Sequence, residues 1–211
     1  MQLTKTRRFR GTPFSAALKR AGGAAYTAYN RTLAALRFES LKCDDRHSKK
    51  RVPVWKTTCR RRIEMNGSDA TGILRVATPG KVDRMLDGRC FCLPVADRIG
   101  GMLNGPVPMK FSGCSLRLSK IECAVDRWTE GIAVGAGIYS VVRELDVFPI
   151  AIQVPHSEPL MESVFGGRVA GMRFFQFEVS KFVARACLCP FPIGQDRADR
   201  KSISMGRRIC A

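Results

Sequence analysis

The sequence has 211 residues and a mass of 23.4 kDa, and its 36 Lys and Arg residues against 18 Asp and Glu residues give a formal net charge of +18. A hydrophobic content of 45% excludes a wholly disordered basic protein, and the length fits one ordinary domain with extensions. Because such a charge repels itself in a compact protein unless a polyanion neutralises it, a nucleic acid is the expected partner, with an acidic membrane surface as the weaker alternative.

The charge is concentrated at the two ends of the chain. Residues 1–64 carry 17 basic and 4 acidic residues, residues 65–193 carry 14 and 12, and residues 194–211 carry 5 and 2. The net charges are therefore +13, +2 and +3. We accordingly predict a basic arm and linker at 1–51, a nearly neutral body at 52–193 and a basic tail at 194–211.

The sequence shows no membrane-spanning segment, and no membrane partner is predicted. No apolar run reaches the roughly eighteen residues of a membrane span, and Lys19 and Arg20 interrupt the one candidate for a secretory signal. The absence of acidic residues before Glu39 is also typical of a mitochondrial targeting segment, so import into mitochondria stays open as an alternative. Nine cysteines without a secretory signal favour free thiols in a reducing compartment.

The elements predicted for the arm are a helix and a linker. Residues 13–38 are rich in Ala and Leu and could form a helix with a weak point at Gly22 and Gly23, but the apolar residues form no clean stripe. The arm is therefore predicted to be partly helical or disordered until it binds. Residues 42–51 are polar throughout and are interpreted as a linker.

From Val52 onward, short β-prone runs alternate with turn residues such as Asn66-Gly67 and Asp87-Gly88. A phase slip at Lys120 and Ile121 indicates a β-bulge. A short helix is expected in a connection, around 82–86 or 96–103. The predicted strands are 52–64, 71–77, 89–95, 107–111, 115–125, 132–142, 145–154 and 172–187. About eight strands at this spacing predict a mainly β fold, a jelly-roll-like antiparallel β-sandwich.

Motifs of catalysis are scarce. The two histidines, His47 and His156, lie in a charged segment and a Pro-flanked loop, and each is interpreted as a solvated side chain. The glycines of 131–137 do not have the spacing of a dinucleotide-binding loop. The sequence therefore predicts that the protein is not an enzyme, takes no cofactor and has no small-molecule substrate.

Two Cys-x-Cys pairs offer a different chemistry. Cys90 with Cys92, and Cys187 with Cys189, would each place two thiols on one face of a strand. Four thiolates could hold a structural zinc ion, although small buried core residues are the favoured interpretation and redox chemistry is the least favoured. No metal site is assigned.

Clusters of arginine and lysine are the strongest functional signal. Few acidic residues balance them, and arginine suits bidentate contact with phosphate. Short runs of this kind also serve as nuclear localisation signals. The residues predicted to contact RNA are Arg7, Arg8, Arg10, Lys19, Arg20, Lys49, Lys50, Arg51, Arg60, Arg61 and Arg62.

A basic arm, a linker and a neutral β-rich body resemble the layout of coat proteins from small positive-strand RNA viruses, and most of all those of the plant ourmiavirus group. The resemblance implies a capsid protein that packages genomic RNA with its arm and self-associates through a jelly-roll body. It would be found in the virion and the host cell cytoplasm, with the nucleus as a further possible location. A ribosomal or ribonucleoprotein component and a nucleic-acid-binding silencing suppressor are the alternatives.

Overall fold

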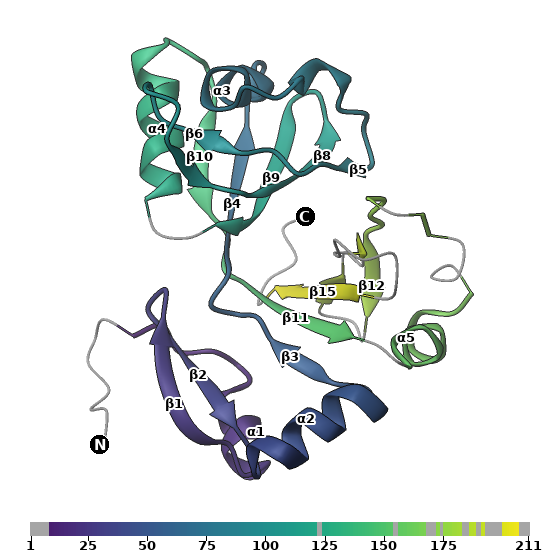
Figure 1. Ribbon diagram of the computed structural model, residues 1–211. Coiled ribbons are helices and arrows are strands. Elements are labelled where there is room, and N and C mark those ends of the chain that lie inside the picture. The colour runs from purple at the N-terminus through teal and green to yellow at the C-terminus, as the bar shows by residue number, and fades with distance from the viewer. Residues whose placement is uncertain are drawn as a thin grey trace. The chain divides into compact units, whose positions relative to one another are not determined.

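The computed structural model of the protein describes residues 9–121, 124–153, 156–167, 172–173, 175–182, 186–188, 191–192 and 200–206 (Figure 1). The chain divides into two compact units. Unit 1 comprises Met1–Cys59, Phe148–Met172 and Val179–Ala211, and unit 2 comprises Arg60–Val147 and Arg173–Glu178. The chain thus passes from unit 1 into unit 2 and returns. The predicted boundaries at 51/52 and 193/194 stay a prediction.

Unit 2 is built on a five-stranded antiparallel sheet with the strand order β10-β4-β9-β8-β5. A separate two-stranded hairpin pairs β6 with β7. The strands of the unit are β4 (Arg61–Asn66), β5 (Arg89–Cys90), β6 (Val95–Ala96), β7 (Met102–Asn104), β8 (Val107–Ser112), β9 (Ser115–Ile121) and β10 (Val141–Glu144).

The core of unit 2 lies between this sheet and its helices. Ile63 pairs with Leu118 and Met65 with Leu116 across β4 and β9, and all four side chains are fully buried. The register of this pair shifts next to Ile63, opposite the stretch between Leu118 and Ile121, where the sequence predicts a β-bulge. Alternation along both strands therefore gives the sheet one continuous apolar face.

Two helices cover that face, with a short 3-10 helix, η1 (Val82–Arg84), after the first of them (Figure 1). In α3 (Ala70–Ala77) four of the five buried residues follow the i, i+3, i+4, i+7 spacing of an apolar helix stripe: Ala70, Ile73, Leu74 and Ala77. The helix α4 (Val125–Gly135) adds its own buried residues to the same cluster. Unit 2 is thus a sheet with helices on one face.

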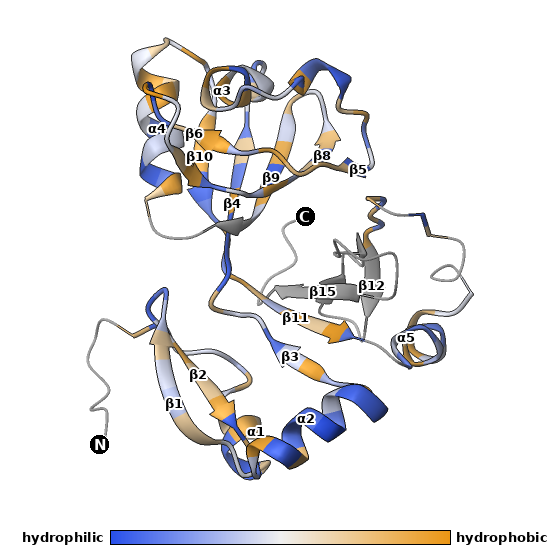
Figure 2. Ribbon diagram, viewed as in Figure 1, coloured by the Kyte–Doolittle hydropathy of each residue, from blue (hydrophilic) through white to orange (hydrophobic). Residues whose placement is uncertain are grey.

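Unit 1 begins with a small helix, a hairpin and a second helix. The turn between the hairpin strands holds Asn30 and Arg31 at φ angles of 49° and 62°, and this left-handed pair is what a two-residue hairpin turn needs to match the twist of its strands. Figure 2 shows that most of the second helix is hydrophilic. The elements are α1 (Ser15–Arg20), β1 (Ala24–Tyr29), β2 (Thr32–Arg37) and α2 (Leu41–Lys50).

The rest of unit 1 contains a four-stranded sheet in the order β14-β15-β11-β3, a two-stranded β12-β13 sheet and one helix. Among the described residues of this part, Phe148, Ile152 and Met161 are the buried apolar ones. Arg10 lies 4.9 Å above the Phe148 ring, a cation–π distance. The elements are β3 (Val54–Lys56), β11 (Val147–Gln153), α5 (Ser157–Phe165), β12 (Ser180–Phe182), β13 (Ala186–Leu188), β14 (Phe191–Pro192) and β15 (Arg200–Gly206).

The predicted jelly-roll-like β-sandwich is wrong. Residues 71–77, predicted as a strand, lie in α3, and the predicted strand at 132–142 is occupied in its first part by α4. The predicted linker at 42–51 is largely the helix α2, and only Ser15–Arg20 of the predicted helix at 13–38 is helical. The protein therefore mixes helices with small sheets. In the ranges that the model describes, no helix has the length and apolarity needed to cross a bilayer.

Candidate functional site

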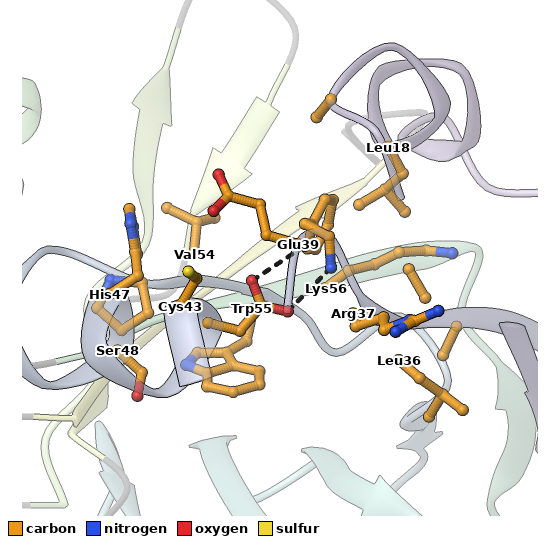
Figure 3. Close-up of a pocket in the computed structure, with 16 residues that line it drawn as sticks. Leu18, Leu36, Arg37, Glu39, Cys43, His47, Ser48, Val54, Trp55 and Lys56 are labelled. Atoms are coloured by element: carbon orange, nitrogen blue, oxygen red, sulfur yellow. Dashed lines mark hydrogen bonds between the residues drawn. The ribbon is translucent and has the colours of Figure 1, made fainter. Parts of the chain in front are cut away.

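A cavity of about 400 Å³ lies in unit 1, between the α1 end, the strands β2 and β3, and the helix α2 (Figure 3). We call it the unit 1 cavity. Its volume falls in the range of small-molecule sites. The residues that line it are Leu18, Ala21, Ala34, Ala35, Leu36, Arg37, Phe38, Glu39, Cys43, Asp44, His47, Ser48, Pro53, Val54, Trp55 and Lys56.

The start of α2 fixes one side of the cavity. Ser40 is the N-cap residue, and its hydroxyl accepts a hydrogen bond from the backbone N–H of Cys43 at 3.2 Å. The Asp44 carboxylate accepts hydrogen bonds from the backbone N–H groups of Phe38 at 2.9 Å and Glu39 at 3.3 Å. The loop between β2 and α2 is therefore tied to the first turn of the helix, and both Asp44 oxygens are occupied.

An apolar wall forms the middle of the cavity. Trp55 lies on β3, opposite Ala151 of β11, and its side chain lies between α2 and β2 in Figure 3. Leu36, Val54 and Trp55 are 62%, 58% and 49% exposed, although each is a large hydrophobic residue. Apolar side chains that line a cavity and keep contact with solvent are typical of a ligand site rather than of a packed core.

Two cationic side chains line the same cavity. The Lys56 ammonium donates a hydrogen bond to the backbone carbonyl of Leu33 at 2.6 Å, which ties β3 to β2. Burial lowers the pKa of Lys56, and the nearby Cys59 opposes this effect only in part. Arg37 is exposed at the end of β2. Cations beside an apolar wall suit an organic anion better than a neutral ligand.

The third side of the cavity carries nucleophilic and titratable groups. Cys43, His47 and Ser48 lie together on one face of α2, as Figure 3 shows, and the Cys43 thiol is free and exposed. The spacing of four residues between Cys43 and His47 places them one turn apart. These groups give the cavity a polar side that faces the apolar wall.

Unit 2 contains two clusters of charged side chains that are paired with one another. The buried Glu64 accepts hydrogen bonds from Arg117 at 2.9 Å and from Arg143 at 2.6 and 2.8 Å. Burial raises the pKa of Glu64, but the bonds from Arg143 and Arg117 outweigh it, so that the pKa is lowered overall. Arg61 bridges Glu144 and Asp126 in the second cluster, and the bond to Glu144 raises its pKa. Pairs of this kind hold neighbouring elements of unit 2 together.

The residues that the sequence predicts as an RNA site are divided between the two units. Lys19 and Arg20 lie exposed at the end of α1, and Lys49 and Lys50 at the end of α2, where Lys49 pairs with Asp45 at 2.8 Å. Arg51 directly follows α2 and is exposed, and Arg10 is half-buried.

The remaining predicted RNA contacts belong to unit 2 or lie outside the described residues. Arg60 is exposed, Arg61 is committed to its two carboxylates, and Arg62 is buried at 4% exposure. Arg7 and Arg8 lie outside the described residues. None of the described members of the predicted set lines the unit 1 cavity, and an RNA-contacting role for them stays a prediction.

The cavity residues were missed because their sequence signal is weak. Trp55 and Lys56 belong to a strand of three residues, and no motif surrounds them. The rarity of tryptophan, with two in the chain, is the one feature that could have drawn attention to Trp55. The helix α2 carried a better signal, a serine cap followed by Asp44 in the first turn and lysines in the last.

The Cys-x-Cys pairs do not form the predicted arrangement where they are described. Cys90 is buried, whereas Cys92 is exposed, because β5 ends at Cys90 and the alternation stops there. Cys189 and the side chain of Cys187 lie outside the described residues. Within the described part of the chain, no three His, Cys, Asp or Glu residues are grouped as a metal site would need.

Comparison with known proteins finds similar enzymes by sequence and by fold. No family model matches the sequence. The chain is 39% identical over 173 residues to the dimethylsulfoniopropionate demethylase DmdA of the bacterium Ruegeria pomeroyi, and the match covers 82% of this chain and 48% of the relative. The chain thus spans about half the length of the curated relative that it matches.

Two solved structures share the fold. One is the glycine cleavage system aminomethyltransferase T from Bartonella henselae, with a TM-score of 0.78 and 16% identity over 92% of this chain and 53% of that one. The other is the heterotetrameric sarcosine oxidase from Corynebacterium sp. U-96, with a TM-score of 0.53 and 12% identity over 90% and 82%. The fold is therefore that of the aminomethyltransferase, with helices and small sheets.

These findings overturn the functional predictions from sequence. The similar proteins are enzymes with small-molecule substrates, so the viral coat protein resemblance, the capsid function and the prediction of a non-enzyme are wrong. The ribosomal and silencing-suppressor alternatives are also contradicted, as are RNA packaging into a large assembly and the absence of a small-molecule substrate. A bacterial relative contradicts the virion, host-cell and mitochondrial locations. The excess of basic residues was misleading because the prediction from sequence assigned all of it to RNA binding.

Proposed function

We propose that the protein acts in an enzymatic reaction that removes a methyl group from the sulfur of a small sulfonium carboxylate, with dimethylsulfoniopropionate as the first candidate. The observation that carries this proposal is the 39% identity to the demethylase over 82% of the chain. Identity at this level over most of a chain is hard to reconcile with an unrelated chemistry, although the chain spans about half of that relative.

The chemistry asks for positioning more than for proton transfer. A nucleophilic acceptor attacks the methyl carbon, the carbon–sulfur bond breaks, and the sulfur keeps the electron pair, so that the sulfonium becomes a neutral thioether. The positive charge is lost from sulfur in this step, and no proton needs to move on the substrate. An enzyme for it must therefore hold the sulfonium and the carboxylate and align the acceptor with the methyl carbon.

The test follows the methyl group directly. Dimethylsulfoniopropionate labelled with ¹³C in its methyl groups is mixed with the 211-residue chain and a panel of acceptors (a thiol, an amine and a reduced pterin) and is followed by NMR. The expected result is protein-dependent conversion of the substrate to 3-methylsulfanylpropanoate, with the label appearing on one acceptor. The thioether itself, which has no sulfonium, serves as the control and should keep its methyl group.

Because the chain spans about half of the relative, binding is measured in the same samples. Line broadening of the labelled methyl signals reports binding even where no turnover occurs. Neither turnover with any acceptor nor broadening of the methyl signals would overturn the proposed function.

A further inference from the structure

The unit 1 cavity combines apolar surface with cations that the protein does not neutralise itself. Trp55 and Phe38 supply aromatic surface, while Arg37 and Lys56 supply positive charge to the same cavity. In the described part of the chain, neither Arg37 nor Lys56 forms an ion pair. Among the described residues, two carboxylates also line the cavity: that of Asp44 accepts hydrogen bonds from the backbone N–H groups of Phe38 and Glu39, and that of Glu39 forms no ion pair with Arg37 or Lys56. The cavity is thus able to accept an outside anion.

Lys56 is held in place for this task. Its ammonium group has three donors, of which one is directed to the carbonyl oxygen of Leu33 at 2.6 Å, and the side chain is half-buried. The bond to a backbone carbonyl fixes the position of the charge without cancelling it. The Lys56 side chain is therefore already ordered before a ligand binds, which lowers the entropy cost of binding and favours affinity.

We propose that the unit 1 cavity is a binding site for a small organic carboxylate, with the carboxylate bound by Lys56 and Arg37 and the apolar or methylated end against the indole of Trp55. The aromatic face also accepts a methylated cation, since ring quadrupoles attract such groups. A carboxylate beside Lys56 relieves the effect of burial that lowers its pKa. The proposal rests on the proposed function only in its choice of dimethylsulfoniopropionate as the first ligand.

The test uses the fact that the chain has two tryptophans. The variant Trp128→Phe leaves Trp55 as the one tryptophan and makes its fluorescence a reporter of the cavity. Propionate, dimethylsulfoniopropionate and the uncharged methyl propionate are titrated into this variant. We expect a saturable change with the two carboxylates and none with the ester.

Two further variants assign the binding to the proposed residues. In the Trp128→Phe background, Lys56→Gln and Arg37→Gln should each raise the dissociation constant for the carboxylates about tenfold or more, which is the usual effect of losing a charge-assisted hydrogen bond. Lys110→Gln is the matched control, because Lys110 also donates to a backbone carbonyl, that of Met85 at 2.9 Å, but belongs to unit 2. It should leave the affinity unchanged.

The results separate this inference from the proposed function. Equal binding of ester and carboxylate, or equal affinity in Lys56→Gln and Lys110→Gln, overturns the inference. If Lys56→Gln does not fold by circular dichroism, the exposed Arg37→Gln decides in its place. Demethylation without any response of Trp55 overturns the inference alone. A saturable response of Trp55 to propionate supports the inference even if dimethylsulfoniopropionate is neither bound nor demethylated, and that last result overturns the proposed function alone.

Discussion

The described residues of unit 2 and unit 1 contribute very unequally to the buried apolar core. Of the buried apolar residues in the described part of the chain, all but Phe148, Ile152 and Met161 belong to unit 2. Both units expose some large apolar side chains, but in unit 1 Leu36, Val54 and Trp55 are exposed around a cavity. The apolar residues of unit 2 are thus used for stability, and those of the cavity remain accessible to a ligand.

The ion pairs of the two units also differ in how far they are buried. Glu64 of unit 2 is buried between Arg117 and Arg143, whereas the Asp45–Lys49 pair of unit 1 is 59% and 71% exposed. Buried pairs cost much to break, and exposed pairs contribute little. The basic excess of the chain therefore has several roles: support of a sheet, solvation of a helix and, by our proposal, recognition of a carboxylate.

The largest expected effect comes from emptying the core of unit 2. Leu118→Ala removes a fully buried side chain between β4 and the helices, and it should lower the free energy of unfolding by about 2–5 kcal/mol. Leu36→Ala, at a residue 62% exposed in unit 1, should change it by less than about 0.5 kcal/mol. Urea unfolding followed by circular dichroism measures both. Equal losses in the two variants would contradict the contrast between the units.

The sequence predicted strands well where polar and apolar residues alternate and failed where small residues intervene. The predicted strand at 107–111 and the start of the one at 115–125 correspond to β8 and β9. In α3, Ala70, Ile73, Leu74 and Ala77 have a helical spacing. The β-branched Thr71, Ile73 and Val76 of the same segment favoured a strand. Helix formation prevails there because the stripe is buried against the sheet.

The candidate site was beyond sequence reasoning for a different reason. The cavity is made by residues of α1, β2, α2 and β3, and the return of the chain after residue 147 supplies β11, which pairs with β3. Its position thus depends on pairings between distant segments, which a local pattern does not carry. Net charge, by contrast, can be counted in any sequence. Its concentration in residues 1–64 gave too much weight to the hypothesis of an RNA-binding coat protein.

A smaller effect is expected from the buried carboxylate of unit 2. Glu64→Gln leaves Arg117 and Arg143 without their shared partner and should cost about 1–3 kcal/mol at neutral pH. Because the folded-state pKa of Glu64 is lowered, its contribution is fully present above the ordinary value of 4.5 and is lost as the pH falls through the lowered value. The wild-type protein should therefore lose more stability than Glu64→Gln between neutral pH and pH 3.

Urea unfolding at a series of pH values measures this difference. Asp45→Asn is the control in unit 1, since its exposed pair with Lys49 should contribute less than about 0.5 kcal/mol. If Glu64→Gln and Asp45→Asn lost stability alike, or if both showed the acid dependence of the wild-type protein, burial of Glu64 would not be the source of the effect.

The smallest effect is expected where unit 1 shapes its cavity. Ser40→Ala removes the cap that accepts the N–H of Cys43 and should cost about 1 kcal/mol, with the first turn of α2 fraying rather than the unit unfolding. Hydrogen exchange should accelerate at Cys43 and, through the loosened Asp44, at Phe38, while the amides of β4 remain protected. Ser40→Asp keeps an acceptor at the cap and should restore slow exchange. Since Cys43 and Phe38 both line the cavity, the same variant should weaken carboxylate binding, whereas a change in β4 exchange would show that the two units are coupled more tightly than their separate cores imply.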